Sequence, residues 1–346
     1  VLKQKGQAEV YLDEARITRA VLAGSMYRAL ASDVEAHCAE AALMLARYHE
    51  ADDHAHQALE LARKANDNGR EAERALLLYR VRARSGAGSL RQDLSDAVVL
   101  ARRTGERARL VLPFIEAASL HLQEGAPALA LRPARRALAL ADPKTQRRER
   151  LMARRVLACA WLDQDNRAQA GPALLDHVAD AELDGFLQEC AEGLVDLARF
   201  HRNGLEFQFV ETAVNRATAL ARELGYRALL APALVLKLEA VCLQGVKQHN
   251  LRAVLSQDLP ELLADLRDAV TPDNDPYCAT SLAFHEALPD VLEGNVDDLD
   301  SLRMEVVEIE NRHPRRKFER RALTLTLSEV CRLLGRLDLA RDLART

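Results

Sequence analysis

Aromatic residues make up only 4% of this 346-residue sequence, and glycine and proline together occupy 26 positions. The composition that strands favour, rich in β-branched and aromatic residues, is missing. Hydrophobic residues nevertheless reach 49%, and the common residue types Ala, Leu, Arg and Glu are strong helix formers. We therefore expect an all-α protein with almost no sheet.

An excess of positive charge is also missing, since the net charge is −4 and the pI about 6.3. No global positive field gathers nucleic acid or an anionic membrane, so we expect this segment to bind neither. The six cysteines show no CxxC spacing and lie among apolar residues, which is typical of buried thiols in a reducing compartment. Without a signal peptide or an apolar run of roughly 18–20 residues, the predicted location is the cytoplasm.

Catalytic signatures are absent as well: the sequence holds no GxSxG, GxxxxGK[ST] or HExxH motif. One cluster of metal-ligand types stands out, because His49, His54 and His56 lie close to Asp52 and Asp53. We interpret His49 instead as the occupant of a recurring aromatic position that faces a neighbouring helix. The sequence therefore predicts no enzyme, no metal site and no cofactor.

An internal repeat is the strongest positive feature. An apolar helix, a Gly or Asp turn and an alanine-rich second helix recur along the chain, and the turn residues Gly125, Asp165, Gly204 and Gly245 are 40, 39 and 41 residues apart. A single helix pair cannot bury its apolar face, so neighbouring pairs stack and share one core. Copies read Ala42-x-x-Leu45-Ala46-x-x-His49, Asp53, Ala58-x-x-x-Ala62-x-x-Ala65; Phe114-x-x-Ala117-Ala118-x-x-His121, Gly125, Ala130-x-x-x-Ala134-x-x-Ala137; and Leu157-Ala158-x-x-Trp161, Asp165, Ala170-x-x-x-Leu174.

This pattern resembles the tetratricopeptide repeat, with a period near 40 rather than 34 residues. Longer repeats of this kind are similar to the sensor arrays of large bacterial transcription regulators. The resemblance implies a right-handed superhelical solenoid of antiparallel helix pairs. The helix-breaking segment Thr271–Pro276 predicts a regular array over residues 1–270 and less regular repeats over 277–346. Because Val1 rather than Met begins the sequence, we expect a fragment of a larger protein.

If the resemblance holds, a partner lies in a groove lined by the first helices. Burial supplies affinity there, while arginines orient carboxylates. The expected partner is a protein or peptide, with an acidic segment and self-association as further options. The positions that the resemblance implies are Arg47, Ser119, Arg155, Asp163, His201, Arg202 and Glu239.

Arginine runs such as Arg147/Arg148/Arg150 and Arg312–Arg321 leave two interpretations open. Guanidinium groups match carboxylate and phosphate, which favours an acidic partner; interleaved glutamates instead favour a solvated outer face. Our functional hypothesis is the sensor or interaction region of a bacterial cytosolic regulator, in signal transduction or transcription control. The alternative is a static scaffold or chaperone-like adaptor of a protein complex.

Overall fold

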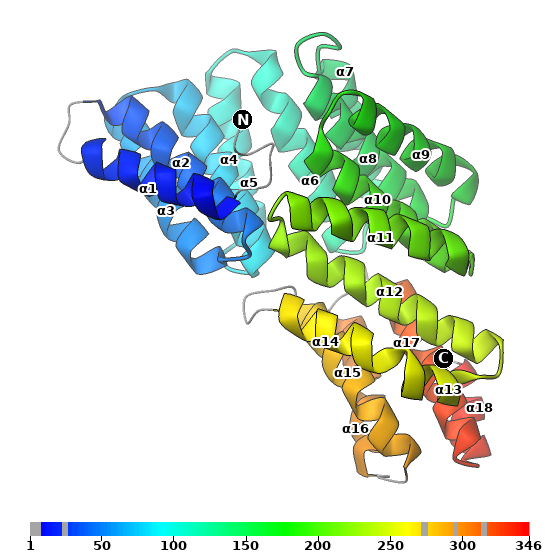
Figure 1. Cartoon of the computed structure of the whole chain (residues 1–346). Helices are drawn as coiled ribbons and strands as arrows, with labels where there is room; N and C mark the ends of the chain where they lie inside the picture. Colours follow the sequence, from blue (N-terminus) through cyan, green and yellow to red (C-terminus); the bar gives the residue numbers. More distant parts are fainter. Residues whose placement is uncertain (1–7, 23–26, 271–275, 294–296, 313–316, 346) are drawn as a thin grey trace. The chain divides into compact units, whose positions relative to one another are not determined.

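The computed structural model of this chain describes residues 8–22, 27–270, 276–293, 297–312 and 317–345. Every regular element in these ranges is a helix, which confirms the all-α prediction (Figure 1). The elements are α1 (Ala8–Leu22), α2 (Arg28–Met44), α3 (Tyr48–Lys64), α4 (Asn68–Ser85), α5 (Leu90–Arg103), the 3-10 turn η2 (Arg107–Leu110), α6 (Val111–Gln123), α7 (Pro127–Leu140), α8 (Arg147–Asp163), α9 (Arg167–Leu183), α10 (Leu187–Asn203), α11 (Phe207–Glu223), α12 (Arg227–Lys247), α13 (Leu251–Gln257), α14 (Leu259–Ala269), α15 (Pro276–Leu292), α16 (Asp297–Arg312), α17 (Lys317–Leu333) and α18 (Leu337–Arg345).

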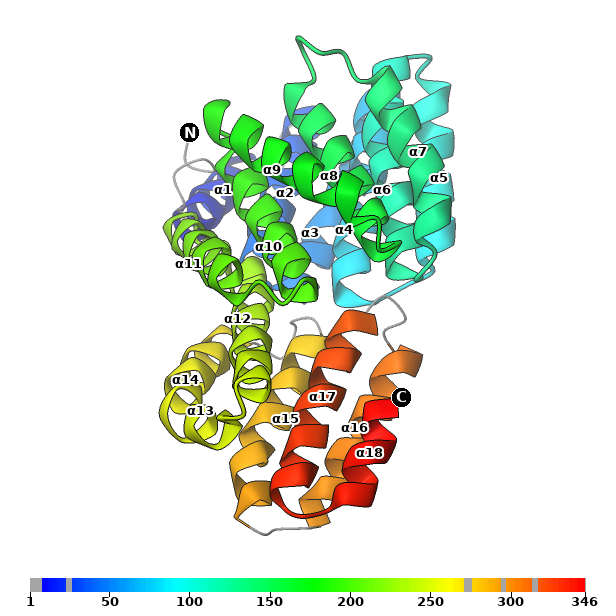
Figure 2. The ribbon, with the colours of Figure 1, turned by 90° about the vertical axis from the view of Figure 1, so that its right-hand side faces the viewer.

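The helices alternate between two roles with a constant step. The first helices α8, α10 and α12 begin at residues 147, 187 and 227, and the second helices α7, α9 and α11 begin at 127, 167 and 207, each 40 residues apart. In Figure 2, α5 and α7 lie at the edge of the amino-terminal part, with the first helices α4 and α6 on their inner side. The chain is therefore a solenoid of antiparallel helix pairs, as the repeat predicts.

Small side chains let the helices of a pair approach closely. In α7 the alanines Ala130, Ala134 and Ala137 recur every three or four residues, on one helix face, and are completely buried. Ala170 takes the equivalent place in α9 and is also completely buried. The recurring alanines thus have a packing role.

The frame predicted for the first repeat is wrong by two helical turns. Helix α2 ends at Met44, the turn residue is Ala46 with φ +58°, and α3 begins at Tyr48. Asp53, predicted as the turn, lies inside α3, and His49 is an exposed residue at its start. The alanines of α3 recur with a seven-residue step, which returns to the same helix face after two turns. A slip of seven residues therefore preserves the pattern.

Two further turn residues differ from the prediction. The residue in the left-handed conformation is Leu205 rather than Gly204, and His249 rather than Gly245. Gly245 lies inside α12, where an added Cβ would be 3.1 Å from the Cα of Leu251. Its small size therefore serves the close approach of α12 and α13.

The chain divides into two compact units. Unit 1 comprises residues 1–122, 126–193 and 219–229, and unit 2 comprises 123–125, 194–218 and 230–346. Each unit has its own apolar core, formed in unit 1 around α2–α8 and in unit 2 around α12–α18. The predicted division at 271–276 falls mostly outside the described residues. Within them, α12 alone is long and apolar enough to cross a membrane, but 67% of its apolar window is buried inside the protein.

Candidate partner-binding face

Polar side chains from four successive first helices meet in unit 1. This first-helix cluster consists of Arg80 and Arg84 on α4, Glu116 on α6, Arg155 on α8, Glu192 on α10 and Tyr226 just before α12. The members come from repeats far apart in the sequence, so only stacking of the repeats brings them together.

The α4 side of the cluster contains an ion pair between neighbouring repeats. Arg80 Nε lies 3.3 Å from Glu116 Oε1. Burial raises the pKa of Glu116, while Arg80 and Arg84 oppose that effect. Because Arg80 and Arg84 are four residues apart, they lie on the same side of α4.

Glu192 is the best-connected group of the cluster. Its carboxylate forms an ion pair with Arg155, accepts a 2.7 Å hydrogen bond from the Tyr226 hydroxyl and a 3.4 Å hydrogen bond from the side-chain amide of Gln188. Burial works against the charged form, but Arg155 and Arg84 outweigh it and hold the pKa of Glu192 at about 2. Glu192 is therefore a fixed negative charge at neutral pH.

Tyr226 is the neutral donor that completes the site. Its side chain is buried, and burial together with Glu192 raises the pKa of the phenol. Neither Tyr226 nor Glu192 exchanges a proton near neutral pH, so this pair is poorly suited to general acid–base chemistry. The arrangement is suited to holding charges at fixed positions.

Arg84 differs from its neighbours. It is exposed, and no hydrogen bond or ion pair joins its guanidinium to another residue in the described part of the chain. Tyr226, Glu192 and Tyr48 raise its pKa, so it is always charged. The cluster thus contains three arginines and two glutamates, so its formal net charge is +1.

The predicted groove residues of unit 1 lie in different surroundings. Arg155 belongs to the first-helix cluster, and Ser119 and Asp163 are half-buried on α6 and α8. Arg47 follows α2 and forms ion pairs of 3.0 Å with Glu9 and 3.9 Å with Glu50. Their predicted role in binding a partner stays a prediction.

Each of the predicted residues of unit 2 is paired with a charged side chain of the same unit. His201 pairs with Glu206 at the end of α10. Arg202 and Glu239 are 2% and 1% exposed and form an ion pair, and Arg202 also lies 3.3 Å from the buried Glu319 of α17. In this conformation Arg202 and Glu239 present no surface to a partner, because α17 covers their side of the first helices.

Only Arg155 of the cluster was among the predicted positions; the other five members are Arg80, Arg84, Glu116, Glu192 and Tyr226. A signal for such pairs exists, since Arg155 and Glu192 have opposite charges and are 37 residues apart, close to one repeat. The pairs Arg202–Glu239 and Arg70–Asp33 show the same 37-residue separation. Opposite charges one repeat apart therefore indicate contacts between successive first helices.

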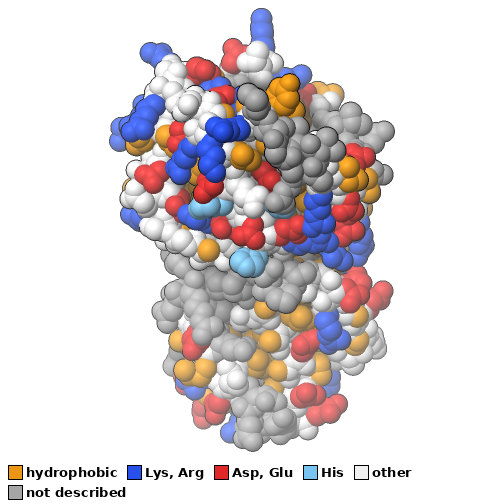
Figure 3. All heavy atoms as spheres, turned by 90° about the vertical axis from the view of Figure 1, so that its left-hand side faces the viewer, with side chains coloured by type: hydrophobic (Ala, Val, Ile, Leu, Met, Phe, Trp, Pro, Cys, Tyr) orange, Lys and Arg blue, Asp and Glu red, His pale blue; other side chains and the backbone are white. Residues whose placement is uncertain are grey.

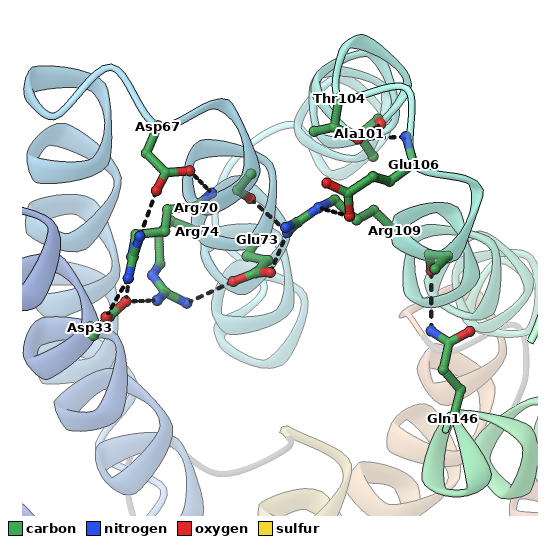
Figure 4. Close-up of polar contacts among 12 residues, drawn as sticks. Asp33, Asp67, Arg70, Glu73, Arg74, Ala101, Thr104, Glu106, Arg109 and Gln146 are labelled. Carbon is green, nitrogen blue, oxygen red and sulfur yellow. Dashed lines mark hydrogen bonds and ion pairs between the residues drawn. The ribbon is translucent and has the colours of Figure 1, made fainter. Parts of the chain in front are cut away.

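A second polar network joins the starts of the first helices in unit 1 (Figure 4). Arg70 and Arg74 of α4 converge on Asp33 of α2, at 2.9 and 2.6 Å, and the Asp67 side chain caps α4 by accepting from the Arg70 amide. Arg109 of η2 pairs with Glu73 of α4. These arginines therefore form ion pairs between successive repeats.

The arginine run of α8 behaves in the same way. Arg147 pairs with Asp184, Arg148 with Glu189, and Arg154 with Asp180, while the Arg150 guanidinium donates to the carbonyls of Leu138 and Ala141 at the end of α7. Basic and acidic side chains are interspersed on the unit 1 surface of Figure 3. The contacts of α8 favour the interpretation of its arginines as structural. In the run Arg312–Arg321, residues 313–316 lie outside the described residues.

The histidines near the start of α3 do not converge. His54 is buried, with Nδ1 2.7 Å from Glu35, whereas His49 and His56 are exposed. Among the described residues, no group of three or more His, Cys, Asp or Glu side chains is arranged to hold a metal ion. Two hollows of about 180 and 320 Å³ are each lined by Arg150 and Arg154, and no residue of the first-helix cluster lines either of them.

No protein-family model matches the chain, and no curated protein matches it in sequence. Its fold is similar to aspartyl phosphate phosphatase F from Bacillus subtilis, with a TM-score of 0.55, 12% identity, and coverage of 99% of this chain and 91% of that chain. It is also similar to the apo form of RapI, with a TM-score of 0.52, 12% identity, and coverage of 99% and 95%. At this identity the likeness shows a shared helical-repeat fold.

Proposed function

We propose that this chain is a protein- or peptide-binding repeat module of a bacterial cytosolic regulator, and that it binds without catalysing a reaction. The first-helix cluster carries the proposal, because it is a polar surface assembled from α4, α6, α8 and α10 that retains an exposed, uncompensated charge. A solenoid exposes such surfaces to extended partners. The Bacillus subtilis neighbour is named an aspartyl phosphate phosphatase, and signalling control is the context that we carry over from it.

The mechanism follows from the pairing of charges between repeats. Arg80–Glu116 and Arg155–Glu192 each join successive first helices. A partner that contacts the cluster adds interactions that depend on the spacing of these helices, so it shifts the array toward one curvature. That change would be transmitted to an output elsewhere in the regulator.

A site-specific crosslinking experiment tests the binding face. We place a photoreactive phenylalanine analogue at Ser119, which is half-buried on α6 one turn from Glu116, and as a control at Leu129, which is 60% exposed on the second helix α7. We expect a protein crosslinked from bacterial lysate at Ser119 but not at Leu129, and the same selectivity with that protein purified. Equal crosslinking at both positions, or none at Ser119, contradicts the proposal.

Hydrogen exchange of the complex separates the regulator from the scaffold alternative. A regulator that changes curvature should show altered exchange in repeats beyond the contact, because helix spacing changes along the array. A static scaffold should show protection only where the partner lies. The comparison uses the full chain with and without the purified partner.

A further inference from the structure

Arg84 lies in the last turn of α4. One turn earlier, Arg80 is neutralised by Glu116. Arg84 lies on the same side of the helix, yet in the described part of the chain its guanidinium has neither a hydrogen bond nor an ion pair. Its guanidinium is therefore an available donor of the cluster, with five N–H groups in a planar fork.

The carboxylate that raises the pKa of Arg84 already has hydrogen-bond and ion-pair partners. Glu192 attracts Arg84 electrostatically, but its oxygens accept from Arg155, Tyr226 and Gln188. A carboxylate has about four lone-pair positions, so three donors leave little capacity for a bidentate Arg84. Arg84 is therefore attracted by a negative charge, while its guanidinium N–H groups have no acceptor among the described residues.

We infer that Arg84 binds one carboxylate of the partner, as a bidentate pair between guanidinium and carboxylate. The inference rests on the proposed function and specifies the chemistry of the partner. Planar, bidentate recognition of this kind is the particular strength of arginine. The carboxylate is an aspartate or glutamate side chain or the end of a chain, since both present the same group.

The single unpaired guanidinium of the cluster favours a monoanion, because Arg80 and Arg155 are already paired with Glu116 and Glu192. Three arginines and two glutamates leave one positive charge, which a single carboxylate neutralises. A phosphomonoester carries about −1.5 to −2 at pH 7. It would leave excess negative charge beside Glu116 and Glu192, which makes it the poorer match.

Two synthetic pools of random octapeptides test the inference. One pool has amidated ends and includes aspartate and glutamate; the other lacks both and has free terminal carboxylates. Immobilised full-length chain is exposed to each pool, and captured peptides are counted by mass spectrometry. The proteins are the parent chain, Arg84→Gln, Arg84→Lys and Arg103→Gln. Arg103 is a matched control because it is exposed in the last turn of α5, so both glutamine variants lose the same cation near a helix carboxyl end.

We expect the parent chain and Arg103→Gln to enrich carboxylate-bearing peptides. Arg84→Gln should reduce that enrichment about tenfold or more, which corresponds to the loss of a hydrogen bond between charged groups. Arg84→Lys should retain part of it, because charge remains while the fork is lost. The pool that shows the effect identifies the source of the carboxylate. Circular dichroism confirms that each variant is folded.

Three results overturn the inference. Enrichment by Arg84→Gln equal to that of the parent shows that another group binds the carboxylate. Capture without preference for carboxylates shows that none is required. If Ser119 crosslinks a partner in either case, the proposed function stands and only the role of Arg84 fails. Failure of the parent chain to capture any peptide overturns the inference, and absence of a Ser119 crosslink overturns the proposed function.

Discussion

Replacement of Gly193 by alanine should destabilise unit 1 although alanine is the better helix former. Gly193 lies in α10, where the ring of His177 from α9 packs against its backbone. An added Cβ would lie 2.9 Å from His177 Nε2, still closer to the ring carbon Cδ2, and 3.1 Å from Val178. The ring must therefore move.

The hydrogen bonds of His177 make that movement costly. Its Nδ1 lies 3.1 Å from the Leu151 carbonyl and its Nε2 3.0 Å from the Glu189 carbonyl, and the side chain is completely buried. Overpacking costs about 1–3 kcal/mol, and a broken buried hydrogen bond about 1–3 kcal/mol. Alanine recovers about 1 kcal/mol of helix propensity. The expected net loss in free energy of unfolding is about 3 kcal/mol.

The single tryptophan provides the assay. Trp161 lies on α8 in unit 1, so its fluorescence during urea unfolding reports on the unit that contains Gly193. With a slope of about 2 kcal/mol per molar urea, the midpoint should fall by about 1.5 M. Gly69→Ala in α4 is the control, because the three atoms nearest its new Cβ all belong to the half-buried guanidinium of Arg109, the closest at 2.8 Å, and a side-chain end can shift more easily than a buried ring. Its midpoint should change by a small fraction of that shift.

A rescue variant separates the clash from other causes. Removal of the ring by His177→Ala should make the further change Gly193→Ala nearly neutral, because the two closest obstructing atoms are gone and only Val178 remains, at 3.1 Å. An unchanged or higher midpoint for Gly193→Ala alone would refute the reasoning. So would an equal cost of this substitution with and without the ring.

Three further predictions concern buried ionisable groups. Arg202→Met should cost unit 2 about 3–5 kcal/mol in urea unfolding followed by circular dichroism, because it leaves the buried Glu239 without its cation; a cost below 1 kcal/mol would contradict this. His285 is completely buried and burial lowers its pKa from 6.5 to about 4, so its contribution to stability is full above pH 6.5 and about 3 kcal/mol should be lost as the pH falls to 4. His285→Phe should lack that part of the pH dependence, and identical pH profiles would argue against it. Tyr226→Phe removes a 2.7 Å hydrogen bond to Glu192, whose pKa of about 2 should rise in a carboxyl NMR titration; an unchanged titration would exclude this bond as a cause.

The repeat itself was predictable because burial imposes a pattern on the sequence. Alanines such as Ala130 and Ala134 must recur on one helix face wherever helices approach closely, and turns must recur at the repeat length. The frame of the first repeat was not predictable, because the buried alanines of α3 fall on the same helix face after a shift of seven residues. Which residue adopts the left-handed turn was also missed at Leu205, where a leucine follows the more obvious Gly204.

The candidate site was predictable only in part. Arg155 was identified, but Arg84 was not, because nothing local distinguishes it from the paired arginines of α4 and α8. Arg202 and Glu239 were predicted to face a groove, yet α17, more than a hundred residues further along, covers them. Sequence periodicity shows which side of a helix is polar, but a polar side is exposed or buried according to what packs against it.

The sequence by itself determined the helix pairs and their 40-residue step, because these follow from local propensity and from the spacing of small and apolar residues. The tertiary structure alone decided which charges meet. Arg155 and Glu192 pair, and Arg202 and Glu239 become buried. The guanidinium of Arg84 has no hydrogen bond or ion pair to another described residue. Pairing depends on the register between stacked helices, and that register is set by packing over the whole array.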